Sequence, residues 1–96
     1  MAKEAELQVA SVEEVSPTEC RCAVRNIRGV ASLGMVFRAE PSRGIEVRLT
    51  EILWYGRTVA QLDEAHTGKV TFAGAGADSI RPDDVLFSPA GGNHVP

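Results

Sequence analysis

The sequence lacks several features that would place it outside the class of ordinary globular domains. It has no apolar run near the roughly 20 residues that a helix needs to cross a bilayer. Its charged start, MAKEAELQ, has no apolar segment of the kind found in signal peptides. Of its 96 residues, 44% are hydrophobic and 24% are charged, which is typical of one domain in water. We therefore expect a cytoplasmic protein with no membrane contact.

An excess of positive charge is also missing. Ten Lys and Arg residues stand against 13 Asp and Glu, which gives a formal net charge of −3. A free-standing nucleic-acid binder usually carries a basic excess, so phosphate contacts over the whole surface are disfavoured. Eight of the ten basic residues are arginines, the better residue for bidentate contacts. A local cluster of arginines that binds phosphate or carboxylate groups therefore remains an alternative.

Cysteine is scarce. Cys20 and Cys22 are too few for a disulfide scaffold, and two positions apart on a strand they point to the same face. We expect both to be small buried apolar side chains. The alternative is half of a metal site completed by His66 or His94, but no second spaced pair of ligands is present. We predict no metal and no cofactor.

A sustained helical period is absent as well. The stretch 49–74 instead alternates apolar and polar residues in short runs that break at Gly56 and Gly68. This pattern is typical of half-buried antiparallel strands. One or two helical turns within residues 58–66 are an alternative, although the two glycines leave little room for a helix.

Short strands separated by glycine and proline turns follow one another along the chain. We expect strands at 7–15, with a bulge or bend near Ser11, and at 19–27, 35–40, 45–49, within 49–74 and at about 84–88. Residues 74–78 are expected to form a flexible connection. A flexible N-terminus (1–6) and a disordered tail (89–96) leave one domain, residues 7–88. Its six or seven strands predict an all-β fold, a small antiparallel Greek-key β-barrel, whose closure removes exposed edges.

Four segments also occur in an order and spacing known from one family. They are Gly29-x-x-x-Leu33-Gly34 before Phe37, Leu49-x-x-Ile52-x-x-x-Gly56, the acidic turn 62–68, and residues 80–86 after Gly74. Over residues 7–90 this resembles the second domain of translational GTPases such as elongation factor Tu, a small β-barrel that follows the G domain. The resemblance implies the same barrel here.

The sequence departs from the family pattern at three positions. Met35 stands where an acidic residue is usual, Lys69 where an acidic or polar one is usual, and Asp83 where a glycine is usual. These changes alter turn chemistry and surface charge rather than the barrel. The 96 residues contain no G-x-x-x-x-G-K-[ST] phosphate loop. We therefore expect the barrel without the G domain, and no enzymatic activity.

The resemblance implies a non-catalytic binding module. In the tRNA-carrying factor the barrel helps to hold the aminoacylated end of tRNA, and an acidic residue of the turn is among the contacts. By position Glu64 resembles that residue, so Glu64, His66 and Arg57 form a candidate recognition surface. The alternative is an ordinary solvated turn.

Arginines on neighbouring strands are further candidates. Arg21, Arg25 and Arg28, with Arg38 or Arg48, can form an exposed face for phosphate or for an acidic protein surface. Because the signs are interleaved, the favoured alternative is cross-strand ion pairing with glutamates, namely Glu19, Glu40, Glu46 and Glu51.

Trp54 and Tyr55 are consecutive, so we expect one ring in the core and the other exposed as a candidate interface residue. The resemblance implies a module that binds RNA or a ribonucleoprotein. The alternative is a protein–protein adaptor with no role in nucleic-acid binding.

Overall fold

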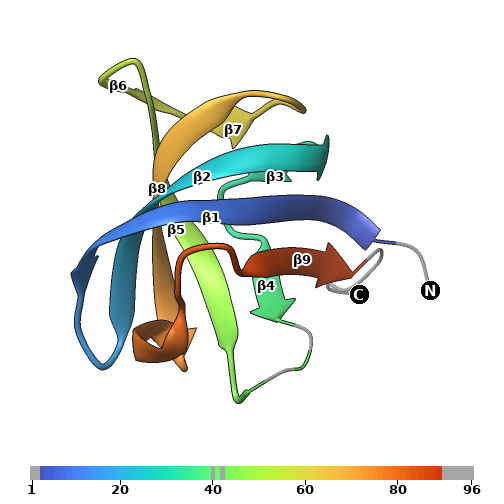
Figure 1. The fold of residues 1–96 in the computed structure, drawn as a ribbon. Coiled ribbons are helices and arrows are strands. Elements are labelled where there is room, and N and C mark those ends of the chain that lie inside the picture. Colours follow the sequence, from blue (N-terminus) through green and yellow to red (C-terminus); the bar gives the residue numbers. More distant parts are fainter. Residues whose placement is uncertain (1–2, 40, 42, 90–96) are drawn as a thin grey trace.

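The computed structural model describes residues 3–39, 41 and 43–89 (Figure 1). These residues form short strands and one turn of 3-10 helix. In chain order the elements are β1 (Lys3–Val15), β2 (Glu19–Gly29), β3 (Ala31–Ser32), β4 (Val36–Ala39), β5 (Glu46–Trp54), β6 (Arg57–Val59), β7 (Gln61–Leu62), β8 (Thr67–Ala75), η1 (Ala77–Ser79) and β9 (Val85–Pro89). Within this described part, no helix has the length and apolar character needed to cross a membrane.

Six of the strands close into an antiparallel barrel. They neighbour one another in the order β4, β9, β1, β2, β8 and β5, and a pairing between β4 and β5 closes the ring. The last strand, β9, returns to lie beside the first (Figure 1). β6 extends the sheet beyond β5, and β3 pairs with β7 in a separate small ladder. The expected Greek-key barrel is therefore confirmed.

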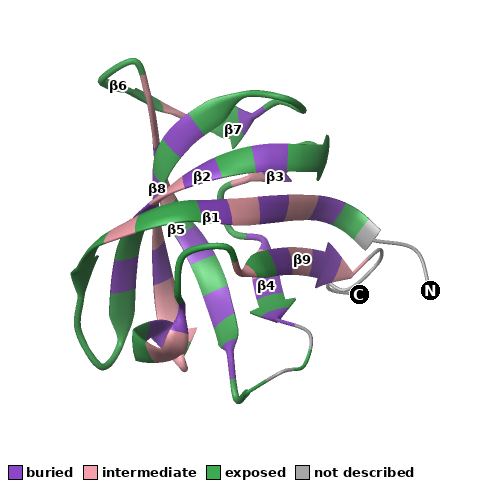
Figure 2. Ribbon diagram, in the orientation of Figure 1, coloured by how far each residue is buried: buried purple, intermediate pink, exposed green. Residues whose placement is uncertain are grey.

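Alternate residues of each strand supply the core, which gives the banded burial pattern of Figure 2. In β2, Cys20, Cys22 and Val24 are fully buried, as the alternation predicts. The rings of Phe37 and Phe72 meet edge to face with centroids 5.6 Å apart. Each large apolar side chain removed from water in this way stabilises the fold by about 1.5–3 kcal/mol.

Shifts in strand register keep this alternation in phase with the core. The register of β1 against β2 shifts between Val9 and Ser11, which confirms the bulge expected near Ser11. The register of β5 against β8 shifts between Leu49 and Glu51. Leu49 and Ile52, three positions apart, are therefore both buried. Without the extra residue, Ile52 would point to solvent.

The ends of the barrel differ in part from the sequence-based expectation. β1 begins at Lys3, so residues 3–6, which we expected to be flexible, pair with β9 and in part with β2. At the other end of the chain Pro89 is the last residue of β9, and residues 90–96 of the expected disordered tail lie outside the described residues.

Two inner segments are also ordered in ways that the sequence did not settle. Residues 57–62 form β6 and β7 rather than helical turns. The connection expected to be flexible at 74–78 continues β8 to Ala75 and then forms η1. A Cβ on Gly74 or Gly76 would come within 2.6 Å of a backbone carbonyl oxygen of the β4–β5 side of the barrel. The glycines here permit close backbone contact rather than flexibility.

Asp84 joins two connections of the barrel and gives a first stability prediction. Its carboxylate accepts hydrogen bonds from the Arg43 guanidinium (2.5 Å) and the Arg81 backbone N–H (2.8 Å). We expect Asp84→Ala to lower the free energy of unfolding by about 1–2 kcal/mol, because charge-assisted bonds are lost at a partly shielded position. Urea denaturation measures the change.

Glu46→Ala is the matched control for this variant. It breaks an ion pair with Arg38 at 3.5 Å whose two side chains are at least half exposed. Such surface pairs contribute little, so we expect a change below about 0.5 kcal/mol. Equal effects of the two substitutions would contradict the role given to Asp84.

Candidate recognition surface

A buried asparagine fixes the end of β2 against the acidic turn. Asn26 has no exposed surface. Its side-chain Nδ2 donates hydrogen bonds to the carbonyl oxygens of Leu62 (2.7 Å) and Gly29 (2.8 Å). Its Oδ1 accepts one from the Arg28 backbone N–H at 3.0 Å. The amide therefore uses both of its polar atoms to hold three backbone groups.

The turn at 63–66 is bound to the same strand by further contacts. The backbone N–H of Ala65 donates to the Asn26 carbonyl (2.7 Å), and the Asn26 N–H donates to the His66 carbonyl (2.9 Å). One carboxylate oxygen of Glu64 accepts a hydrogen bond from the Gly29 N–H at 2.8 Å. Glu64, a candidate contact residue, thus also stabilises the end of β2.

Three aromatic rings lie in a row at the β5–β6 hairpin. Trp54 packs against the core, and its ring stacks on His66 with centroids 5.2 Å apart and planes 20° apart. The Tyr55 ring meets the Trp54 ring edge to face with centroids 4.9 Å apart, and Tyr55 is 87% exposed. One ring packs against the core and the other is exposed, as expected.

The tight turn explains the position of Tyr55. Trp54 pairs with Arg57, so the loop between them has two residues, Tyr55 and Gly56, with φ of 52° and 75°. Two positive φ values are the signature of a type I′ turn, which fits the twist of a hairpin. Tyr55 therefore projects at the hairpin tip rather than alternating as a strand residue.

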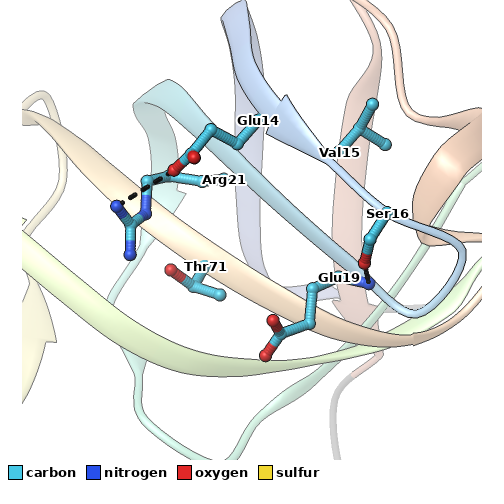
Figure 3. A pocket seen from close by; sticks show the side chains of 6 residues that line it. All are labelled: Glu14, Val15, Ser16, Glu19, Arg21 and Thr71. Carbon is cyan, nitrogen blue, oxygen red and sulfur yellow. Dashed lines mark hydrogen bonds and ion pairs between the residues drawn. The ribbon is translucent and has the colours of Figure 1, made fainter.

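Arg21 lies in a shallow hollow of about 230 Å³ on the outer face (Figure 3). Its guanidinium points toward Glu14, with an N–O distance of 3.2 Å, and also lies 3.6 Å from Glu51. The Ser16 hydroxyl in the same hollow accepts a hydrogen bond from the Glu19 backbone N–H. Because Arg21 has two carboxylates beside it, this hollow offers little free positive charge to an anion.

Other predicted arginines are also occupied. Arg28 pairs with Glu6 at 3.1 Å and Arg38 with Glu46 at 3.5 Å. Arg48 donates a hydrogen bond to the Gly34 carbonyl at 2.6 Å. The cross-strand pairing expected of Glu46 and Glu51 is confirmed. The pairing expected of Glu19 is wrong, because Glu19 forms no ion pair with a described residue, and Glu40 lies outside the described residues.

Arg25 and Arg57 differ from these arginines. Both are exposed, and neither forms an ion pair with any residue in the described ranges. Arg25 lies opposite Thr67, the residue after His66, and borders a shallow hollow beside Glu64. Arg57 lies opposite Trp54, whose ring stacks on His66. Arg25 therefore borders the turn at 63–66, and Arg57 lies beside Trp54, whose ring stacks on His66.

Sequence reasoning singled out these residues but missed a neighbouring apolar groove. Ala23, Leu53 and Lys69 line it together with Tyr55. The available signal was period two, which places Ala23 on the face of β2 opposite to Cys22. That signal does not reveal that β5 and β8 bring Leu53 and Lys69 alongside.

The two cysteines are buried and are not joined by a disulfide bond, as expected for apolar core residues. Burial raises the pKa of both thiols, and for Cys22 the neighbouring Cys20 raises the pKa further. Across residues 3–39, 41 and 43–89 no group of three or more His, Cys, Asp or Glu side chains is placed to hold a metal ion. His94 lies outside these residues.

These thiols predict how stability depends on pH. Above pH 9.0, the usual thiol value, the unfolded chain releases protons that the folded chain keeps. The free energy of unfolding should therefore fall as the pH rises, by up to about 1.4 kcal/mol per pH unit for each thiol. Urea denaturation between about pH 8 and 10.5 measures the slope. In the double variant Cys20→Ala/Cys22→Ala, the free energy of unfolding should fall less steeply with pH, because the contribution of the two thiols is gone. If the wild type and the double variant had the same slope, the burial of the thiols would be contradicted.

No sequence-family model matches the chain, and no curated protein sequence does. Its fold is similar to that of solved translation factors. Translation elongation factor SelB from Methanococcus maripaludis in its apo form has a TM-score of 0.76 at 12% identity, over 88% of this chain and 18% of that one. The same factor in complex with the GTP analogue GPPNHP has a TM-score of 0.76 at 11% identity, and the match covers 92% of this chain and 20% of that one. GDP-bound aIF5B from Aeropyrum pernix has a TM-score of 0.74 at 17% identity, and the match covers 91% of this chain and 15% of that one.

At these identities the likeness shows the fold. The chain spans a fifth or less of the length of these proteins. The matched part is a barrel domain of translational GTPases, which confirms the expected domain 2-like barrel without the G domain in these 96 residues.

Proposed function

We propose that this translation-factor-like barrel is a non-catalytic recognition module that binds single-stranded RNA, alone or within a ribonucleoprotein. The binding surface consists of Arg25, Arg57, Glu64 and His66, and is called the RNA surface below. An RNA partner of this kind would place the chain in the cytoplasm. The observation that carries the proposal is the uneven pairing of the arginines.

Four of the eight arginines are paired with a carboxylate, Arg43 with Asp84 among them. Arg21, Arg28 and Arg38 have carboxylate partners within 4 Å, whereas Arg25 and Arg57 have none in the described residues. A phosphate beside a paired arginine also meets the negative charge of the carboxylate partner, so unpaired cations attract it more strongly. Arg48 and Arg81 also lack a carboxylate partner in the described residues, but the Arg48 guanidinium donates a hydrogen bond to the Gly34 carbonyl. Of the unpaired arginines, Arg25 borders the hollow beside the 63–66 turn, and Arg57 lies opposite Trp54, whose ring stacks on His66.

The same surface supplies groups other than charge. The His66 ring stacks on the half-buried Trp54, which holds it in a fixed orientation. Proteins that bind single strands combine such rings with a cationic path for the backbone. The hydrogen bonds of Asn26 and Glu64 hold the turn against β2. A pre-ordered surface loses less conformational entropy on binding. Similarity to translation factors supports this proposal by analogy only.

Titration of a fluorescently labelled single-stranded RNA by anisotropy tests the proposal. We expect binding at low salt that weakens as salt is added. With two phosphate contacts the slope of log K against log salt should be about −1.4. The double variant Arg25→Gln/Arg57→Gln should bind at least tenfold more weakly.

The matched control is Arg21→Gln/Arg38→Gln, which removes the same charge from ion-paired positions. It should bind within about twofold of the wild type, because the lost cations are neutralised on the protein. Absence of low-salt binding by the wild type, or equal losses in the two double variants, would overturn the proposal.

Protein binding is a second candidate, favoured by Tyr55. A tyrosine that is 87% exposed is typical of an interface rather than of a folded core. The net charge of −3 also disfavours extensive phosphate contact. Protein docking through this ring predicts an affinity that salt changes little, in contrast to RNA binding.

A further inference from the structure

A shallow apolar groove of about 370 Å³ lies beside the hairpin tip. It runs over the outer face of β2, β8 and β5, where Ala23 lies opposite Lys69 and Lys69 opposite Leu53. Tyr55 and Gly56 of the hairpin also line it. Apart from the Tyr55 hydroxyl, the polar side chains that line the groove are those of Thr67 and Lys69. Most of the lining is therefore methyl, ring and backbone carbon.

The groove carries almost no free charge. Its only charged lining residue is Lys69, whose ammonium lies 3.2 Å from the Glu13 carboxylate. Neither Arg25 nor Arg57 lines it. A phosphate group would find its one cation already paired, whereas an uncharged apolar side chain would desolvate no unpaired charge. The charge pattern thus matches a neutral apolar occupant.

Tyr55 is held at a cost to the fold. Its φ of 52° lies in the left-handed region, which disfavours a residue with a Cβ by roughly 1–2 kcal/mol. Asn, Asp and Gly are the usual residues at this position of a type I′ turn. The ring gains little burial in return, since 87% of the residue is exposed. A strained, exposed aromatic that the fold does not require indicates a contact residue.

We infer that this groove docks a protein segment through one uncharged apolar side chain of leucine or phenylalanine type, with Tyr55 as the anchoring contact. In this arrangement the occupant's side chain lies against Leu53 and the backbone of Gly56 and Gly68. The backbone of the bound segment then passes over the hairpin tip. The inference deepens the second candidate function, protein binding through Tyr55, and does not rest on RNA binding, because the groove contains none of the residues of the RNA surface.

Two small probes, N-acetyl-L-phenylalaninamide and N-acetyl-L-leucinamide, test the groove without a known partner. Titration into ¹⁵N-labelled protein should shift the amide signals of Gly56, Gly68 and Lys69 in a saturable way. The nucleotide AMP should leave these signals unchanged. Tyr55→Asn should weaken the response at least fivefold. It should also raise the melting temperature, because asparagine tolerates the left-handed backbone better.

Val15→Asn is the matched control, since Val15 is also an exposed apolar residue (54%) but does not line the groove. It should leave the probe titration unchanged. Absence of shifts with both apolar probes, an unchanged response in Tyr55→Asn, or a stronger response to AMP would each overturn the inference. Arg25→Gln/Arg57→Gln should respond to the probes like the wild type, which separates failure of this inference from failure of RNA binding.

Discussion

Replacing Asn26 by leucine is expected to lower the free energy of unfolding by about 3–5 kcal/mol. Leucine has a similar size but no polar atoms, so it leaves the carbonyl oxygens of Gly29 and Leu62 and the N–H of Arg28 without this partner. Asn26 is completely buried, and each polar group left unsatisfied beside it costs about 1–3 kcal/mol. Thermal and urea denaturation measure the loss.

The size of this effect follows from position and not from residue type. Gln61→Leu is the control, because the Gln61 amide donates only to the exposed Asp63 carboxylate at 2.9 Å. We expect that variant to change stability by less than about 0.5 kcal/mol. If Asn26→Leu were equally mild, the clamp between β2 and the 63–66 turn would not be important to the fold.

Gly29→Ala is expected to destabilise the barrel by about 3 kcal/mol or more. The residue has a φ of 73°, and an added Cβ would lie 2.0 Å from the Glu4 carbonyl oxygen. The left-handed backbone alone costs an alanine about 1–2 kcal/mol. The clash forces β1 and β2 apart where they pair, which adds a strain of about 1–3 kcal/mol. Denaturation curves of the variant measure the sum.

Gly34→Ala separates the two contributions. Gly34 also has a positive φ (91°), but an added Cβ there meets no atom within 4 Å. This variant should lose only the free energy of the left-handed backbone, about 1–2 kcal/mol. Similar losses in both variants would show that steric contact at Gly29 contributes nothing.

Local sequence patterns predicted the features that depend on neighbouring residues. Period two placed Cys20 and Cys22 in the core, and the break in alternation after Val9 located a bulge. The closed barrel, in contrast, was supported by the family resemblance as well as by strand number. The β3–β7 ladder was not predicted, since each strand has two residues and pairs with a segment about 30 positions away.

Local sequence patterns did not predict which residues of the candidate surface are unpaired or exposed. Which arginine is free depends on cross-strand register, because Arg21 meets Glu14 and Glu51 from two other strands. The exposure of Tyr55 depends on a two-residue turn that could be located only once Trp54 and Arg57 were paired. Glycines at 74 and 76 indicated flexibility, yet both permit close backbone contact. A glycine in a sequence does not distinguish these two uses.

The central claim is that RNA binds where arginine charge is unpaired. The most direct measurement is a ¹H–¹⁵N chemical-shift map of the labelled protein with a single-stranded RNA at low salt. We predict shifts for the amides of Arg25, Arg57 and residues 64–67 that disappear when the salt is raised. An absence of shifts at low salt, or shifts centred on the hollow around Arg21, would contradict the account.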